Sequence, residues 1–71
     1  MALHFLAATR VRKVELDSVP GCICLLPGVL MAGVGDWLDV EGHGRFRALK
    51  IEWTGADNDE ACITVEPVAG R

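Results

Sequence analysis

The stretch WLDVEGHGRFRALKIEW, residues 37–53, carries the clearest fold signal in this chain of 71 residues. Apolar and charged side chains alternate on both sides of a glycine-rich turn, the pattern of two antiparallel strands with one buried face. We predict strands at 37–41 and 45–53, joined by a three-residue loop with Gly44 in the left-handed conformation. The predicted partners are Glu41 with Arg45, Val40 with Phe46, Asp39 with Arg47 and Leu38 with Ala48. A two-residue loop at 43–44 would instead mix charged and apolar faces.

The second strand of this hairpin changes its apolar face part-way along. Its apolar positions have one parity up to Ala48 and the other from Leu49 onward, so we predict a bend at that point. The register places Trp37 opposite Leu49. Two outcomes stay open: a strong bend buries Trp53 in the core, and a weaker one leaves Trp37 and Trp53 flanking an exposed apolar patch suited to a protein partner.

The segment CICLLPGVLMAG, residues 22–33, contains no charged side chain. We predict a hairpin with strands at 22–26 and 29–33 around a Pro27-Gly28 turn, apolar on both faces. One face belongs to the core of the domain. The other face is expected to pack against a second copy of the chain, because monomers rarely expose so much apolar surface. The residues predicted to mediate self-association are Ile23, Leu25, Leu26, Val29, Leu30 and Met31.

The remaining segments also have the character of strands. A first strand is predicted from His4 to Leu16. Phe5, Ala7 and Val11 share one parity and Val14 and Leu16 the other, so we expect a bulge or bend near Arg12-Lys13. The turn DSVPG follows it, and the polar loop TGADNDE precedes a last strand over 61–66. The prediction is an all-β domain spanning 1–71, a small SH3-like barrel or sandwich of five to six antiparallel strands.

Composition restricts the class of protein and its compartment. With 51% hydrophobic and 24% charged residues the chain is a folded domain, and its net charge of −3 disfavours non-specific binding to nucleic acid. The apolar run over 19–34 is broken by proline and glycine and is shorter than the roughly 20 residues of a membrane span. No positive segment precedes the apolar N-terminus, so we expect a cytoplasmic protein, or a virion component if the chain is phage-borne.

The sequence lacks the patterns expected of a hydrolytic or acid–base site. Ser18 is the only serine, and neither histidine has a serine or cysteine nearby in a recognisable arrangement. The carboxylates of Asp36, Asp39 and Glu41 are interpreted as a solvated face, because the predicted register gives the last two arginine partners. We therefore expect a protein that is not an enzyme.

Three cysteines, Cys22, Cys24 and Cys62, are the other reactive side chains. An odd number fits reduced thiols better than a disulfide framework. Structural zinc sites draw on two close pairs of ligands, and no second pair exists here. The acidic run over 57–60 also lacks the glycine and distal glutamate of a calcium loop. No metal and no cofactor are predicted, and the cysteines are interpreted as small apolar side chains in strands.

The one basic run comprises Arg10, Arg12 and Lys13. Charged residues on an edge strand discourage aggregation, which is the favoured interpretation. The alternative is that they meet a phosphate backbone, which would make the chain a small regulator or inhibitor that binds nucleic acid or a nucleoprotein. Arg10 and Arg12 join the two tryptophans as candidate partner-binding residues.

The stretch VGDWLDVEGHGRFRALKIEW, residues 34–53, resembles small SH3-like barrels, including those of bacteriophage head–tail connector proteins. The resemblance implies a five- or six-stranded barrel that acts as an adaptor. The predicted function is a non-catalytic protein-binding or assembly module, bacterial or phage-borne, that forms homo-oligomers. A pocket for a small ligand at a subunit interface stays open as a further interpretation.

Overall fold

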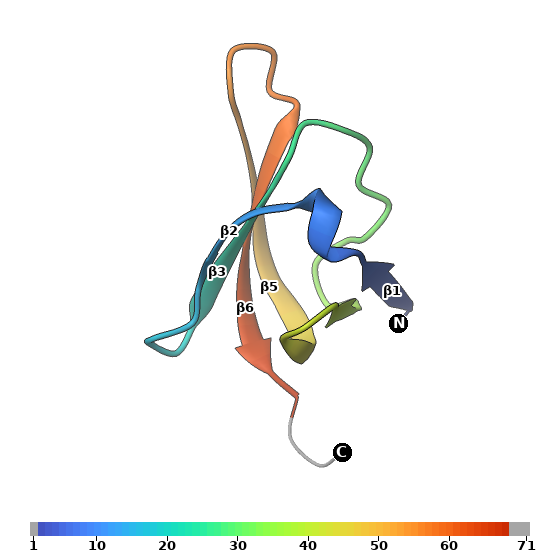
Figure 1. Cartoon of the computed structure of the whole chain (residues 1–71), viewed down its shortest axis with the longest axis vertical. Coiled ribbons are helices and arrows are strands. Elements are labelled where there is room, and N and C mark those ends of the chain that lie inside the picture. The colour runs from blue at the N-terminus through green and yellow to red at the C-terminus, as the bar shows by residue number, and fades with distance from the viewer. Residues whose placement is uncertain (1, 69–71) are drawn as a thin grey trace.

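The structure is a computed structural model, and it describes residues 2–68. These residues form six β-strands and one 3₁₀ turn, joined by loops (Figure 1). The elements are β1 (Leu3–Leu6), the 3₁₀ turn (Ala8–Arg10), β2 (Val11–Glu15), β3 (Gly21–Leu25), β4 (Trp37–Val40), β5 (Gly44–Thr54) and β6 (Glu60–Pro67). The prediction of an all-β chain is confirmed.

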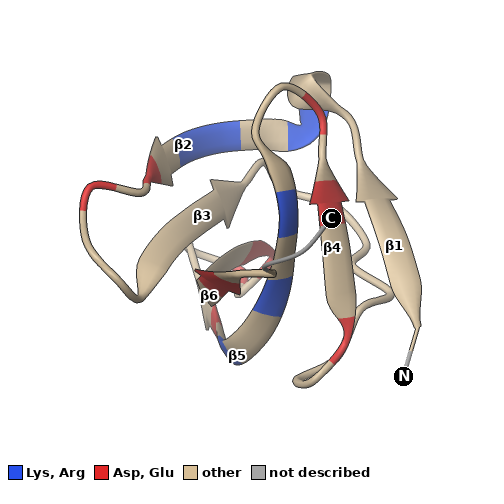
Figure 2. Ribbon diagram, turned by 90° about the horizontal axis from the view of Figure 1, so that it is seen from below, with Lys and Arg blue, Asp and Glu red and all other residues tan. Residues whose placement is uncertain are grey.

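The strands form a single sheet in the order β1-β4-β5-β6-β3-β2, and this sheet curls into a half-barrel (Figures 1 and 2). Four of its neighbouring pairs are antiparallel, and β1 pairs with β4 in parallel. The prediction of antiparallel strands throughout is therefore wrong at this edge. The reason lies in the connection, since the chain leaves β1, builds β2 and β3 at the opposite edge and then returns to β4.

The β4–β5 hairpin has the predicted faces but a shifted register. Leu38 lies opposite Phe46 and Asp39 opposite Arg45, so the predicted partners Ala48 and Arg47 are wrong by two residues. The loop is Glu41–His43, one position earlier than predicted, and the His43 N–H bonds the Val40 carbonyl at 2.9 Å. Gly42 and Gly44 both adopt positive φ, 84° and 101°, which lets the turn close early. A shift of two keeps every side chain on its face.

The predicted bend in β5 is confirmed. The pairing with β6 shifts between Ala48, opposite Val65, and Lys50, opposite Thr64, which leaves Leu49 as the extra residue of a bulge. Beyond the bulge, Ile51 faces the same side of the sheet as Ile63. The bulge therefore allows both parities of β5 to contribute to one concave apolar surface.

Only the first four residues of the segment CICLLPGVLMAG, residues 22–25, lie in a strand. Residues 29–33, predicted as the second strand of a hairpin, form a loop. Both sides of β3 are already taken, by β2 and β6, so no edge remains for a returning strand. The loop instead carries the chain across to β4, with Leu30 and Ala32 packed on the core and Val29 and Met31 exposed.

The predicted first strand from His4 to Leu16 is divided by the 3₁₀ turn, because β1 and β2 lie at opposite edges of the sheet. Its bulge is confirmed, since the pairing with β3 shifts between Val11 and Lys13. Phe5 faces outward and is 64% exposed, and the neighbouring Leu6 is buried. The turn predicted at DSVPG does connect β2 to β3.

The core fills the concave side of the sheet. Its buried members come from every strand except β2 and are Leu6, Ile23, Leu25, Leu38, Val40, Phe46, Ala48, Ala61, Ile63 and Val65. Partly buried side chains of β2 and of the loop after β3 complete it. Within residues 2–68, no helix has the length and apolar character needed to cross a membrane.

Candidate functional site

The two edges of the sheet differ in charge. The β2 edge carries Arg12, Lys13 and Glu15, and charged side chains of this kind block the addition of further strands. The β1 edge, sequence LHFL, carries no Lys, Arg, Asp or Glu, as its uniform colour in Figure 2 shows. Leu3 and Phe5 on this edge are 51% and 64% exposed. The β1 edge is thus open to another strand where the β2 edge is not.

The backbone of β1 has hydrogen-bonding capacity to spare. The Trp37 N–H bonds the Ala2 carbonyl at 2.8 Å, and the Glu41 N–H bonds the Leu6 carbonyl at 2.9 Å. Because successive residues of a strand direct their N–H and C=O groups to opposite sides, those of Leu3 and Phe5 face away from β4. Within residues 2–68, no other element forms a hydrogen bond to them.

A groove of about 320 Å³ runs between β1 and the loop at 29–32. It is lined by Leu3, His4, Phe5, Leu6, Arg10, Val29, Leu30, Met31 and Ala32. The Arg10 guanidinium donates to the Val29 carbonyl at 3.1 Å and so holds the loop beside the 3₁₀ turn. We call Leu3, Phe5, Val29 and Met31 the apolar edge, because these four exposed side chains border the unpaired side of β1.

Asp36 fastens β1 to the loop and to the start of β4. Its carboxylate contacts His4 Nε2 at 3.1 Å and accepts the backbone N–H groups of Gly33 and Ala2 at 3.0 and 3.3 Å. The hydrogen bond from Gly33, followed by the contact with His4, lowers the pKa of Asp36 below its ordinary value. His4, which lines the groove, and Gly33, which follows it in the loop, are therefore held by a carboxylate that stays ionised into acid.

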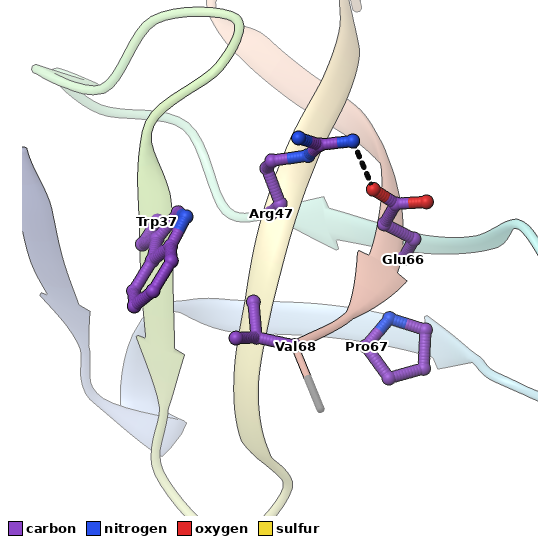
Figure 3. Close-up of a pocket in the computed structure, with 5 residues that line it drawn as sticks. All are labelled: Trp37, Arg47, Glu66, Pro67 and Val68. Carbon is purple, nitrogen blue, oxygen red and sulfur yellow. Dashed lines mark ion pairs between the residues drawn. The ribbon is translucent and has the colours of Figure 1, made fainter. Parts of the chain in front are cut away.

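A second, shallower hollow lies on the outer face of the sheet (Figure 3). It has a volume of about 230 Å³ and is lined by Trp37, Arg47, Glu66, Pro67 and Val68. The guanidinium of Arg47 pairs with the Glu66 carboxylate, and the Arg45 guanidinium lies 5.8 Å from the centre of the Trp37 ring. Leu3 is the register partner of Trp37 and shares its face. The indole thus adjoins the apolar edge.

The predicted self-association residues divide between core and surface. Ile23 and Leu25 are 0% and 1% exposed and form part of the core. Leu30 is half-buried at the groove, and Val29 and Met31 beside it are strongly exposed. Leu26 is exposed at the start of the same loop. The structure gathers three of the six at the groove.

The two tryptophans do not form one patch. Trp37 lies opposite Arg47 on the outer face, which corrects its predicted pairing with Leu49. Trp53 lies beyond the bulge, opposite Ala61 on the concave side, and is 45% exposed. The two indoles therefore lie on different faces of the sheet, Trp37 on β4 beside the first half of β5 and Trp53 near the end of β5.

The basic run is engaged within the chain. Arg10 binds the loop carbonyl described above, Arg12 lies 3.5 Å from Glu60, and Lys13 lies 3.2 Å from Glu15. These acidic neighbours reduce the positive field that a phosphate backbone would require. Arg10 acts as a support of the groove, and Arg12 lies at the opposite edge of the sheet.

The acidic residues and cysteines offer no grouped metal ligands. Of the three carboxylates considered above, Asp36 binds His4 and two backbone amides, Glu41 accepts the Ala8 N–H at 2.8 Å, and Asp39 lies opposite Arg45. Over residues 2–68, no cluster of three or more His, Cys, Asp or Glu side chains is placed to hold a metal ion.

Sequence reasoning missed Leu3 and Phe5 as surface residues. The available signal was the absence of Lys, Arg, Asp and Glu from residues 1–9, whereas the rest of the predicted first strand, residues 10–16, contains four of these residues. Comparisons with models of protein families, with curated proteins and with solved structures find no match for this chain. The apolar edge is therefore the feature of the molecule from which a function is inferred.

Proposed function

We propose that this chain is a non-catalytic protein-interaction module that assembles by pairing β1 with β1 of a second copy. The single observation that supports this is the apolar edge, where unpaired backbone groups of β1 lie beside four exposed apolar side chains. Addition of a strand to an open edge is a common mode of protein recognition, in which main-chain hydrogen bonds supply affinity and side chains supply specificity. In this proposal the half-barrel serves as an adaptor, as in the SH3-like barrels that residues 34–53 resemble.

An antiparallel pairing centred on His4 uses all the outward-facing groups of β1. Leu3 then lies opposite the partner subunit's Phe5, and Phe5 opposite the partner subunit's Leu3. Both are hydrogen-bonded pairs, because the N–H and C=O groups of these residues face the open edge. A two-fold axis relates the copies, so the same surface is used twice and the assembly closes as a dimer.

The side chains favour the same register. Residues directly opposite each other in a sheet share a face, so Leu3 would be flanked on the outer face by Trp37 and by the partner subunit's Phe5. Aromatic and aliphatic cross-strand pairs of this kind contribute roughly 0.2–1 kcal/mol each, in addition to the burial of their apolar area. Val29 and Met31 would cover the groove beneath the new strand.

Phe5→Lys tests this proposal by placing a charge on the edge without touching the core. The wild-type chain is expected to have the mass of a dimer in light scattering, and the variant that of a monomer with an unchanged circular dichroism spectrum. Val19→Lys is the matched control, because Val19 is 75% exposed in the turn between β2 and β3. It should remain a dimer.

Two outcomes would contradict the proposal. One is a wild-type chain that stays monomeric at high concentration. In that case the β1 edge would be available only to a strand of a different protein. The other is a Phe5→Lys variant that remains a dimer, which would move the interface to the Trp37 hollow or to Trp53.

A further inference from the structure

Three thiols lie together on the outer face of the sheet, where β3 pairs with β6. Cys24 and Cys62 are register partners, and their Sγ atoms are in direct contact at 2.7 Å. Cys22 lies two residues earlier on β3, on the same face, with its Sγ 3.8 Å from that of Cys24. In the spatial order of the strands this site is remote from β1.

One pair in this cluster has the geometry best suited to a disulfide. Residues directly opposite in an antiparallel pair have Cα atoms about 4.5–5.5 Å apart, inside the range of roughly 4.4–6.8 Å found across disulfides. Cys24 and Cys62 are such a pair. Cys22 is opposite Thr64, so its relation to Cys62 is diagonal, at about 7–8 Å. Its distance to Cys24 along the strand, about 6.6 Å between Cα atoms, is near the upper limit.

We propose that Cys24 and Cys62 are a thiol modification site, which a peroxide converts to an intramolecular disulfide joining β3 to β6. In the first step the Cys62 thiolate attacks one peroxide oxygen, the O–O bond breaks, and Cys62 becomes a sulfenic acid as the second oxygen leaves as water or an alcohol. In the second step the Cys24 sulfur attacks the Cys62 sulfur. The sulfenic hydroxyl leaves with the Cys24 proton as water, and the S–S bond forms.

The environments of the two sulfurs set this order of events. Cys62 is half-buried, with the Thr54 hydroxyl 4.0 Å from its sulfur, so a small peroxide has access to it. Cys24 is buried, and that burial, reinforced by the neighbouring thiols, raises the pKa of Cys24 to about 12. Cys24 is thus a neutral thiol at physiological pH and is the slower of the two toward peroxide. Its contact with Cys62 makes it the resolving residue.

The disulfide would close the chain between β3 and β6, a segment that includes the loop after β3 and the β4–β5 hairpin. Linking distant residues restricts the unfolded chain and stabilises the folded one. We therefore expect oxidation to raise the thermal midpoint of the protein. Because the site is remote from β1, the Phe5→Lys variant should respond to peroxide as the wild type does.

The test treats the full chain with hydrogen peroxide under native conditions and follows it by mass spectrometry and thermal unfolding. The wild type should lose the mass of two hydrogen atoms, and trypsin should release residues 14–45 linked to residues 51–71. Cys22→Ala is the matched control and should give the same linked peptides and the same rise in thermal midpoint.

Cys24→Ala and Cys62→Ala should lose both the link and the rise. Because alanine is small and apolar, these variants are expected to retain the spectrum of the folded protein, and circular dichroism before oxidation checks this. The proposal is overturned if the wild type keeps free thiols or forms mainly intermolecular disulfides. It is overturned equally if Cys24→Ala forms the link through Cys22 as readily as the wild type does.

Discussion

Gly21 shows how one residue without a side chain determines a tight approach of strands. It begins β3 directly after the turn from β2, and it is buried. A Cβ atom here would lie 2.7 Å from Leu16 Cδ2 and 2.8 Å from the Glu15 carbonyl oxygen. The leucine side chain can move, but the backbone oxygen cannot do so without disturbing β2. The absence of a side chain, rather than a special backbone angle, is what this position requires.

Gly21→Ala should therefore destabilise the fold. We expect a loss of about 1–3 kcal/mol, the usual cost of forcing extra atoms into a packed site, measured as a lower urea midpoint. Gly33→Ala is the control, because its Cβ would meet only Asp36 Oδ2 at 3.9 Å. It should leave the midpoint unchanged or raise it slightly. Equal midpoints for Gly21→Ala and the wild type would mean that β2 can yield at this contact.

At the scale of elements, whether a strand edge was free for hydrogen bonding decided which apolar segments became strands, and the apolar pattern of a segment did not. Residues 29–33 are as apolar as β3, yet they form a loop because β2 and β6 already occupy both sides of β3. β1 has the opposite situation, since it is a strand with a partner on one side only. Within the described chain, the most exposed part of the loop and the unpaired side of β1 are brought to the same groove.

The proposed dimer makes a residue-specific prediction for β1. Amide hydrogen exchange at Leu3 and Phe5 should slow as the protein concentration rises, because their N–H groups would bond the second copy. The amides of His4 and Leu6 face β4 and should change little. Phe5→Lys should remove the concentration dependence at Leu3. Association without slower exchange at these two positions would mean that the copies meet through side chains and not through the strand edge.

At the scale of the whole molecule, Asp36 joins segments that are distant in the sequence. Its carboxylate contacts His4 and Ala2 at the N-terminal strand and Gly33 in the loop. Because Asp36 directly precedes β4, these contacts join β1, the loop and β4. Its pKa is lowered in the folded state, so its contribution to stability is present above the ordinary pKa of an aspartate. That contribution is lost as the pH falls through the lowered value.

Asp36→Asn should accordingly be less stable than the wild type at neutral pH, because the charge that His4 and the backbone N–H groups favour is gone. The difference should shrink in acid, where the wild-type carboxylate also becomes neutral. Urea midpoints measured from neutral pH into acid check this. Asp17→Asn, in the turn between β2 and β3, removes the same charge elsewhere and should not reproduce the trend. A constant difference at all pH values would assign the role of Asp36 to shape and not to charge.

The alternation of apolar and polar residues along the chain was sufficient to predict several strands, turns and bulges of this protein. The β4–β5 hairpin, its faces, the bend at Leu49, the bulge in β2 and the turn before β3 all follow from apolar parity and from glycine or proline at turns. These features depend on neighbours in sequence, which a pattern of period two records directly. The predicted hairpin register differs from the observed one by two residues. A shift of two keeps every side chain on the same face, so the parity of the apolar residues does not distinguish the two registers.

Only the tertiary structure decided which edges meet and which apolar segments stay outside. Four features depend on residues that are far apart in the chain. They are the parallel pairing of β1 with β4, the exposure of Phe5, the loop at 29–33 and the contact of Cys24 with Cys62. Both the apolar edge and the thiol site depend on these contacts. Their physical origin is a competition among all strands for a limited number of edges, and no single stretch of sequence contains that competition.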